Sequence, residues 1–458
     1  MADILPFIGT RYNTQLLGAA NLAKVLAPPY DAITPDLQDI LHTRHEHNVV
    51  RMELGRDEPD DNAFSNRYTR AANTLKTWRS DGILIEDEKP GFYLYEQEFA
   101  AADGTAVKRR GFFALVKLED YDSGTIRAHE HTSDGPKADR LKLIRQAKAN
   151  VSAICVTHDD PDGRAAELLA QRMDTDKPWE ETADEQGTVH RLWVVQKKDF
   201  VQAMHELLKD RPLVIVDGHH RFETALEFRD EQRDETGKAD GKQPFDYAMM
   251  FISPRGAGGP AVLPTHRALT REFMKEVNFA EAYEELGDHF DIAPAKLDLS
   301  DPASAGLAVV AKLVELGATR MTMAMVVADG RAFYLTLKDD SDPADLIDDE
   351  DLPDSVKGLD VSILHHYVIN QVMVGNPEFE LDEDDCLYTP DAGTALALLT
   401  AKKASLAFIL NPSSMEQIDR VVEAGGRMAC RSTLLHPAVA TGLVFRNMET
   451  ETKKSAKR

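Results

Sequence analysis

Cysteine is scarce in this sequence of 458 residues. Cys155, Cys386 and Cys430 lie far apart and in no metal-type spacing, which excludes a disulfide framework and a zinc ribbon and indicates a reducing compartment. The sequence also lacks an apolar run long enough to span a bilayer. Its first residues, MADILPFIGTRYN, lack the basic segment and apolar run of a signal peptide. We therefore expect a cytoplasmic protein without a membrane partner.

The sequence also has fewer basic than acidic residues. The 53 Lys and Arg residues face 78 Asp and Glu residues, which gives a formal net charge of −25. Such a balance repels a polyanion at long range. The basic end TKKSAKR has no interleaved aromatic residue and is typical of a solvated terminus. We expect no nucleic-acid partner, and composition leaves the oligomeric state open.

What the sequence does contain is the composition of an ordinary globular protein. Hydrophobic residues make up 43% and charged residues 29%. The length predicts two or three domains, and the alternation of helix and strand patterns predicts an α+β fold with mixed sheets and packed helices. We expect an N-terminal α+β region with a β-hairpin, a core that carries the chemical motifs, and a C-terminal α/β domain, over residues 1–125, 126–270 and 271–458.

Local signals place several elements. Thr34 and Pro35 are typical of an N-cap and a first-turn proline. The stretch FSNRYTRAANTLKTWRSDGIL predicts a helix that ends near residues 81–82. Two β-rich runs flank Asp103-Gly104, a pair typical of a hairpin turn. These signals support the α+β prediction for the N-terminal region.

The stretch LVIVDGHHRFETALEF, residues 213–228, places several residue types that bind ligands at one corner, between a predicted strand and a predicted helix. LVIV has the continuous apolar character of a strand covered on both faces, and RFETALEF has helical spacing. Gly218 allows a tight turn and a close approach of a ligand to the backbone. The helix then begins with free N–H groups and a partial positive charge, which attract phosphate or carboxylate. The corner therefore predicts an anion site.

The side chains at this corner suit the same chemistry. Arg221 offers a planar fork to phosphate oxygens, while His219 and His220 can donate hydrogen bonds or move protons near neutral pH. Asp217, at the carboxyl end of the strand, can hold a phosphate-bound metal or act as a base. The alternative is that Asp217 caps the helix and the other three are ordinary surface or interface groups.

The stretch AHEHTSDGPKADR forms a second cluster. On an extended segment His129 and His131 share one face, where they can bind a metal, and Glu130 lies opposite. Lys137 and Arg140 lie three residues apart near a helix start and can contact an anion.

The alternative for residues 137–148 is a solvated basic helix. A third, weaker motif is LPTHRAL, in which His266 and Arg267 follow a loop. His365 and His366 lie in an apolar helix pattern that favours a core or interface role.

Taken together, the motifs resemble a known family. APPYDAIT, NVVRMELG, HEHTSDGPKADRLKLI, ANVSAI, VDGHHRFETAL, LPTHRAL, LDVSILHH and STLLHPAVATGLV occur in this order over nearly the whole chain and resemble the bacterial and archaeal domain of unknown function 1015 family. That family tends to have Met-Pro-x-Lys-Ser-Thr followed by an aromatic residue and Pro-Lys. Here the chain reads MACRSTLLHPA, so Arg431 stands for the first lysine and Ala438 cannot stand for the second.

The Asp-Gly-His-His-Arg corner is similar to the phosphate-binding turn of the ParB and sulfiredoxin superfamily. Its members bind CTP or ATP and include a kinase that acts on free serine. This resemblance implies a ParB/sulfiredoxin-like nucleotide-binding core with a second α/β unit. By the same resemblance the nucleotide phosphates lie against Gly218, His219, His220 and Arg221.

We therefore predict a nucleotide-dependent phosphotransferase that acts on a small hydroxylated, serine-like metabolite. It would use ATP or ADP, with CTP as the alternative, together with Mg²⁺. Further candidates for phosphate binding are Lys137, Arg140, His266 and Arg267. Candidates for the carboxylate that takes the hydroxyl proton or orients the acceptor are Asp31, Glu130 and Asp217, of which Asp31 lies in a turn set by prolines.

Two other hypotheses stay open. In the first, His129, His131 and Asp217, with His219 or His220, hold a metal ion that activates water for hydrolysis. In the second, the protein senses a nucleotide without turnover and changes its association with a partner. The distance in space between the HEHT and DGHHR motifs would distinguish best between these hypotheses. The sequence does not give that distance.

Overall fold

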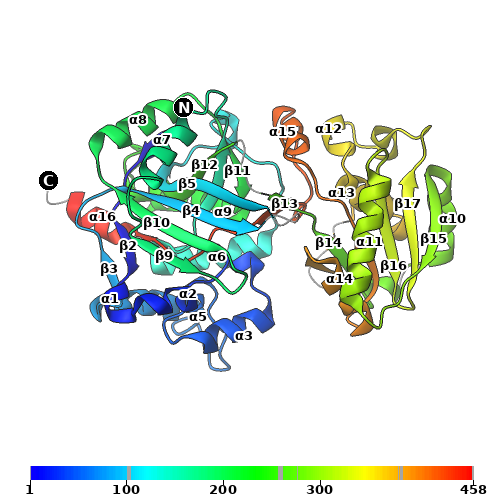
Figure 1. Ribbon diagram of the computed structural model, residues 1–458, viewed down its shortest axis with the longest axis horizontal. Coiled ribbons are helices and arrows are strands. Elements are labelled where there is room, and N and C mark those ends of the chain that lie inside the picture. The colour runs from blue at the N-terminus through cyan, green and yellow to red at the C-terminus, as the bar shows by residue number, and fades with distance from the viewer. Residues whose placement is uncertain are drawn as a thin grey trace. The chain divides into compact units, whose positions relative to one another are not determined.

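The computed structural model describes residues 2–100, 105–255, 261–275, 277–379, 381 and 385–455. The chain forms two compact units (Figure 1). The first unit comprises Met1–Ala128, Thr132–Pro260 and Pro437–Arg458, and the second comprises His129–His131 and Ala261–His436.

Mixed sheets with packed helices make up the first unit, which confirms the predicted α+β class. Its strands are β1 (Ile4–Leu5), β2 (Gly9–Tyr12), β3 (Leu84–Glu86), β4 (Phe92–Ala100), β5 (Ala106–Lys117), β6 (Ile126–Arg127), β7 (Ala149–Asn150), β8 (Ile154–His158), β9 (Glu180–Ala183), β10 (Val189–Val195), β11 (Leu213–Asp217), β12 (Tyr247–Pro254) and β21 (Phe445–Asn447). Its α-helices are α1 (Thr14–Leu17), α2 (Leu22–Val25), α3 (Pro35–Arg44), α4 (Val50–Glu53), α5 (Arg67–Ser80), α6 (Asp134–Ala147), α7 (Arg164–Met173), α8 (Lys198–Leu208), α9 (His219–Thr236) and α16 (Met448–Ser455).

A nine-stranded sheet is the centre of this unit. Its order is β6-β11-β8-β12-β5-β4-β10-β9, and β1 pairs with β5. β11 runs parallel to β6 and antiparallel to β8, so the sheet is mixed. One hydrophobic cluster joins this sheet to buried side chains of α7, α8 and α9, among them Leu169, Met204 and Phe222. The packing of α9 on the sheet fixes the corner at the end of β11.

The predicted local elements are confirmed. The Thr34 hydroxyl accepts from the Leu37 amide at 3.3 Å at the start of α3, and α5 ends at its C-cap Asp81. All four residues of LVIV are buried, as expected for a strand covered on both faces. β4 and β5 pair antiparallel, while the predicted turn Asp103-Gly104 lies outside the described residues.

The division into units differs from the predicted one at residues 125/126 and 270/271. β4 and β5 precede residue 126, yet they pair with β10 and β12, which follow it. Backbone hydrogen bonds across one sheet therefore hold both predicted segments together. The end of the chain also returns to the first unit, because β21 pairs with β2 and β7 in a separate four-stranded sheet.

The second unit has its own mixed layers. A six-stranded sheet of order β15-β17-β16-β19-β14-β18 packs against α11 and α14 through an apolar cluster that includes Val309, Leu313 and Leu396, and β13 pairs with β20. The strands are β13 (Ala261–Leu263), β14 (His266–Thr270), β15 (Phe290–Lys296), β16 (Thr322–Val327), β17 (Arg331–Leu337), β18 (Cys386–Thr389), β19 (Ala404–Ile409) and β20 (Leu434–His436). The helices are α10 (Phe279–His289), α11 (Pro302–Gly317), α12 (Asp354–Lys357), α13 (Asp360–Ser362), the π-helical Ile363–Val374, α14 (Ala392–Thr400) and α15 (Met415–Glu423).

A search of the described residues finds no helix with the length and apolar character needed to cross a bilayer.

Candidate functional site

The corner between β11 and α9 is built by a left-handed glycine. The pairing of β11 with β8 shifts register between Ile215 and Asp217, an irregularity that re-aims the last side chain of the strand. Gly218 follows with φ of 90° and is the N-cap of α9. Because a glycine occupies the N-cap, Asp217 does not hold the capping position that the alternative hypothesis gave it. The first-turn amides of α9 are therefore not capped by a side chain of the N-cap residue.

Arg221 lies at the centre of the corner. Its Nη2 lies 2.9 Å from Asp217 Oδ2 and 3.7 Å from Asp31 Oδ2. Its Nη1 donates to the Ala153 carbonyl. Within the part of the chain that the structure describes, the buried Nε has no hydrogen-bond partner. A Cβ placed on Gly218 would lie 3.0 Å from both Nε and Cζ of Arg221, so the guanidinium lies against the turn itself.

Asp31 reaches this guanidinium from far along the sequence. It belongs to a short 3-10 turn, Tyr30–Ala32, that follows Pro29. Burial, together with the neighbouring Asp217 carboxylate, raises the pKa of Asp31 from 3.8 to about 6, while Arg221 opposes the shift. About a third of the Asp31 side chain stays exposed, at 35%. Two carboxylates thus share one guanidinium at the helix N-terminus.

We expect this arrangement to make stability depend on pH through Asp31. The folded state holds the Asp31 proton more tightly than the unfolded state does, since the folded pKa is about 6 and the ordinary value is 3.8. The stabilisation of the folded state that protonated Asp31 provides is therefore complete below about pH 4, and it is lost as the pH rises through about 6. Asp31→Asn should melt at a higher temperature than wild type at pH 7.5, with a smaller difference at pH 4.5. Thermal unfolding in EDTA without nucleotide measures this.

A matched control for the pH experiment is Asp36→Asn, which removes an exposed carboxylate five residues away in the first turn of α3. It should leave the pH dependence of the melting temperature as in wild type. If Asp31→Asn and wild type differ by the same amount at both pH values, the raised pKa of Asp31 is wrong.

Glu53 is a residue of this site that the sequence did not predict. Its side chain is 1% exposed, and Oε1 accepts from the Tyr30 amide at 3.1 Å and from Ser152 Oγ at 2.7 Å. Arg140 Nη1 donates to the Glu53 carbonyl at 2.7 Å and lies 3.9 Å from Oε1. The available signal was a lone acidic residue in the mostly apolar run VVRMEL, whose only other charged residue is Arg51. A buried carboxylate needs partners, so such a residue marks a structured polar site.

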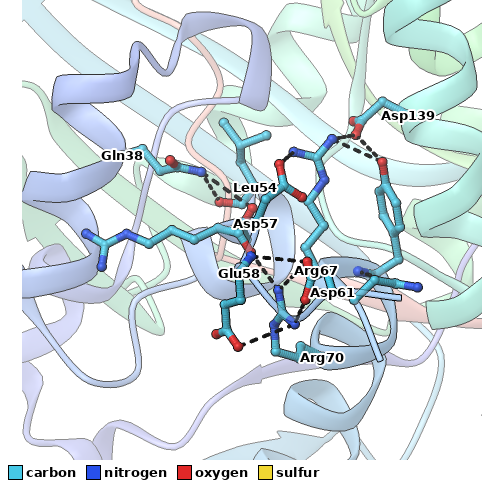
Figure 2. A network of polar contacts seen from close by, with 12 residues as sticks. Gln38, Leu54, Asp57, Glu58, Asp61, Arg67, Arg70 and Asp139 are labelled. Atoms are coloured by element: carbon cyan, nitrogen blue, oxygen red, sulfur yellow. Dashed lines mark hydrogen bonds and ion pairs between the residues drawn. The ribbon is translucent and has the colours of Figure 1, made fainter. Parts of the chain in front are cut away.

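Asp139 and Arg140 hold α6 in place through polar contacts with residues outside the helix. Figure 2 shows Asp139 within reach of Arg67, whose Nη2 donates to it at 2.5 Å. The Tyr68 hydroxyl donates to Asp139 at 2.8 Å, and Arg140 Nε does so at 2.7 Å. The Arg140 guanidinium also lies over the Tyr30 ring at 4.1 Å. Arg140 is therefore a buried structural group, unlike the exposed Lys142, Arg145 and Lys148 of the same basic segment.

The N-termini of α6 and α9 meet. The Ser133 amide, at the N-cap of α6, donates to His220 Nε2 at 3.0 Å, and Thr132 Oγ1 donates to Glu223 at 2.5 Å. Lys137 Nζ lies 3.5 Å from Glu223 and 3.2 Å from Asp134. α6 begins at Asp134, so Lys137 lies in its first turn, as the sequence indicated. Two helix N-termini at one place reinforce the positive field that favours an anion.

The first three residues of the HEHT motif, His129–His131, lie by their contacts in the second unit, whereas Thr132 belongs to the first unit. His129 is fully buried, and its Nε2 lies 2.8 Å from Thr433 Oγ1. Glu130 Oε1 accepts from the Thr433 amide at 2.7 Å. His131 is exposed, so the two imidazoles do not share one environment. Glu130 and the two histidines therefore belong to the second unit, together with the segment Arg431-Ser432-Thr433.

The THR motif also belongs to the second unit. His266 is buried, its Nδ1 accepts from the Leu410 amide at 3.2 Å, and burial lowers its pKa to about 4. Arg267 is fully buried, and its Nε lies 2.9 Å from His365 Nε2. His219, by contrast, lies in the first turn of α9 and is 5% exposed. The predicted site residues therefore fall into two groups, one in each unit.

Metal ligation was one of the sequence-based hypotheses. Over the residues that the structure describes, no group of three or more His, Cys, Asp or Glu side chains is placed to hold a metal ion. The ligand role of His129 and His131 stays a prediction. At the corner, Asp31 and Asp217 offer the hard oxygen ligands that Mg²⁺ takes together with phosphates.

Comparison with known proteins gives a family and several similar folds. The sequence matches the family described as "Protein of unknown function (DUF1015)" over residues 4–362, which confirms the predicted family. No curated protein matches the chain.

Three solved structures are similar to this chain. A free serine kinase variant in complex with AMP is 10% identical, with a TM-score of 0.34 over 74% of this chain and 93% of that chain. A conserved hypothetical protein from Pyrococcus furiosus is 10% identical, with a TM-score of 0.34 over 74% and 96%. SbnI with a C-terminal truncation, from Staphylococcus aureus, is 11% identical, with a TM-score of 0.33 over 75% and 94%.

Proposed function

The chain belongs to the family described as "Protein of unknown function (DUF1015)", and we propose that it is a nucleotide-dependent phosphotransferase that acts on a small hydroxylated metabolite. One observation carries the proposal: the buried guanidinium of Arg221 lies on Gly218 at the N-terminus of α9. A helix N-terminus whose N-cap residue has no capping side chain, together with a guanidinium at the same turn, favours a multiply charged oxyanion.

The chemistry of phosphoryl transfer fits these groups. Transfer needs positioning of the phosphates and neutralisation of their charge more than covalent catalysis. The first-turn amides of α9, the nearby N-terminus of α6 and Lys137 would bind the phosphates. Mg²⁺ would neutralise the charge on the phosphates, and Asp217 would hold it. Arg221 would stay fixed between Asp217 and the Ala153 carbonyl, which orients it without a loss of entropy on binding.

The acceptor needs a carboxylate that orients its hydroxyl group or takes the proton. Asp31 and Asp217 both contact Arg221 and stay candidates for this role, whereas Glu130 lies in the other unit. ATP or ADP is the proposed nucleotide, with CTP as the alternative. The serine-like acceptor follows from the similarity of the corner to the superfamily that contains the kinase for free serine.

We expect nucleotides to stabilise the protein against heat. A ligand that binds only the folded state stabilises it by about 2.7 kcal/mol at a concentration of 100 Kd. Thermal unfolding with ATP, ADP, CTP and GTP, each with Mg²⁺, should raise the melting temperature for at least one nucleotide. A phosphate-transfer assay with serine and other hydroxyl acceptors then tests turnover.

The outcomes separate the hypotheses. Stabilisation with transfer supports the phosphotransferase, and stabilisation without transfer to any acceptor supports a nucleotide sensor. Absence of stabilisation by every nucleotide contradicts the proposal. Inorganic phosphate at the same ionic strength is the control for a general salt effect.

A further inference from the structure

A small polar cavity lies beside Arg221 in the first unit. It measures about 50 Å³, and its walls come from α4, α6, β7 and the segment that follows it, β8, α9 and β12. Its polar lining residues are Glu53, Arg140, Asn150, Ser152, Arg221 and Thr224. A water molecule needs about 10–15 Å³ on the same measure, so the cavity has room for about three water-sized groups. It can take one end of a small molecule but not a nucleobase or a chain of phosphates.

Two polar atoms of opposite character are unsatisfied in the residues around this cavity. Glu53 Oε2 and Arg221 Nε are both buried, and no hydrogen-bond partner for either occurs in the described ranges. One is an acceptor and the other a donor. Leaving such groups unpaired costs free energy, so the cavity favours an occupant that pairs with both.

The surrounding charges limit what the occupant can be. The guanidinium groups of Arg140 and Arg221 repel a cation, which disfavours an ammonium group. Arg140 and Arg221 are already paired with Asp139 and Asp217, so the Glu53 carboxylate disfavours a phosphate or carboxylate in the cavity. A neutral hydroxyl group remains, because it donates one hydrogen bond and accepts another. The same Arg221 guanidinium also lies on Gly218, where the proposed phosphates bind.

We propose that this cavity binds the hydroxyl group of the acceptor and that Glu53 is the catalytic residue that takes its proton. The inference rests on the proposed function. The hydroxyl donates to Glu53 Oε2 and accepts from Arg221 Nε. Its oxygen then forms a bond to the terminal phosphorus, while the bond from that phosphorus to the bridging oxygen breaks. The electron pair leaves with the nucleoside diphosphate when ATP is the donor, or with the monophosphate when ADP is, and the proton passes to Glu53.

Glu53→Gln tests the proton transfer. With ATP, Mg²⁺ and a hydroxyl acceptor, we expect kcat to fall by about 100-fold or more, since general bases contribute about 10²–10⁴ in rate. Nucleotide affinity should stay as in wild type. The matched control is Glu96→Gln, because Glu96 is 2% exposed and pairs with Arg110 and Arg191 in the sheet. Transfer by Glu53→Gln within twofold of wild type would overturn the inference.

A second variant tests the cavity without removing a charge. Ala225→Val adds two methyl groups to the wall formed by α9. We expect the KM for the acceptor to rise about tenfold or more, with an unchanged Kd for nucleotide. A merely structural role of the cavity would change both constants or neither, and either result would contradict the inference.

A binding measurement separates this inference from the proposed function. L-serine and homoserine, each compared with its counterpart without the hydroxyl, L-alanine and 2-aminobutyrate, are added to wild type with and without nucleotide. We expect the melting temperature to rise only with a hydroxylated member, and less in Ala225→Val. If nucleotide binds but no hydroxylated compound exceeds its counterpart, the cavity assignment fails while nucleotide binding stands. If the hydroxyl effect appears without any nucleotide effect, the proposed function fails and the hydroxyl site stands.

Discussion

Arg221→Ala should lower the free energy of unfolding by about 3–5 kcal/mol, the usual cost of breaking a buried ion pair. The substitution leaves Asp217 and Asp31 facing each other without the guanidinium that now lies 2.9 Å and 3.7 Å from them. It also removes the donor to the Ala153 carbonyl. Because the same side chain lies on Gly218, we expect the variant to lose the nucleotide-dependent rise in melting temperature as well. Urea unfolding measures the first effect and thermal unfolding with nucleotide the second.

The same helix provides a matched control. Arg229 is also buried, at 3% exposed, and its guanidinium donates to the Leu118 carbonyl and to Asp120 and Asp230. Arg229→Ala should therefore destabilise the protein but keep the stabilisation by nucleotide. Arg221→Lys keeps the charge without the planar fork and should bind nucleotide more weakly than wild type. If Arg221→Ala binds every nucleotide as tightly as wild type does, the placement of the phosphates is wrong.

Gly218→Ala should destabilise the protein and weaken nucleotide binding at the same time. The backbone at Gly218 has φ of 90°, and an L-residue in a left-handed conformation costs about 1–2 kcal/mol. The added Cβ would also lie 3.0 Å from Arg221 Cζ, tighter than ordinary van der Waals contact. The guanidinium has to move away from the turn, although Asp217 and the Ala153 carbonyl hold it. We expect at least a tenfold rise in the Kd for nucleotide, measured by titration calorimetry.

Gly237→Ala separates backbone strain from the displacement of Arg221 as the cause of weaker nucleotide binding. Gly237 is the C-cap of α9 with φ of 67°, and a Cβ there meets no other described atom within 4 Å. The control therefore adds a similar backbone strain without touching Arg221. We expect Gly237→Ala to lower stability and to leave nucleotide affinity unchanged. Equal losses of affinity in both variants would show that backbone strain, and not the position of Arg221, controls binding.

The sequence by itself determined the local elements and the corner. Thr34 and Pro35 specify the start of α3 because the cap acts within a few residues, and LVIV followed by Gly218 specifies a buried strand, a tight turn and a helix. Hydrogen bonds and steric limits of this kind act between residues that are close in sequence. A short stretch of sequence is therefore enough to predict them. The order of motifs also identified the family.

Tertiary structure alone decided which of the candidate residues meet. Asp31 contacts Arg221, and Glu53 accepts from Ser152, although many residues separate the partners in each pair. His129–His131 and the THR motif, by contrast, belong to the second unit. These outcomes depend on strand order and helix packing, which follow from burial of apolar surface over the whole chain. The free energy that pairs distant segments comes from many weak contacts, so no short stretch of sequence contains it.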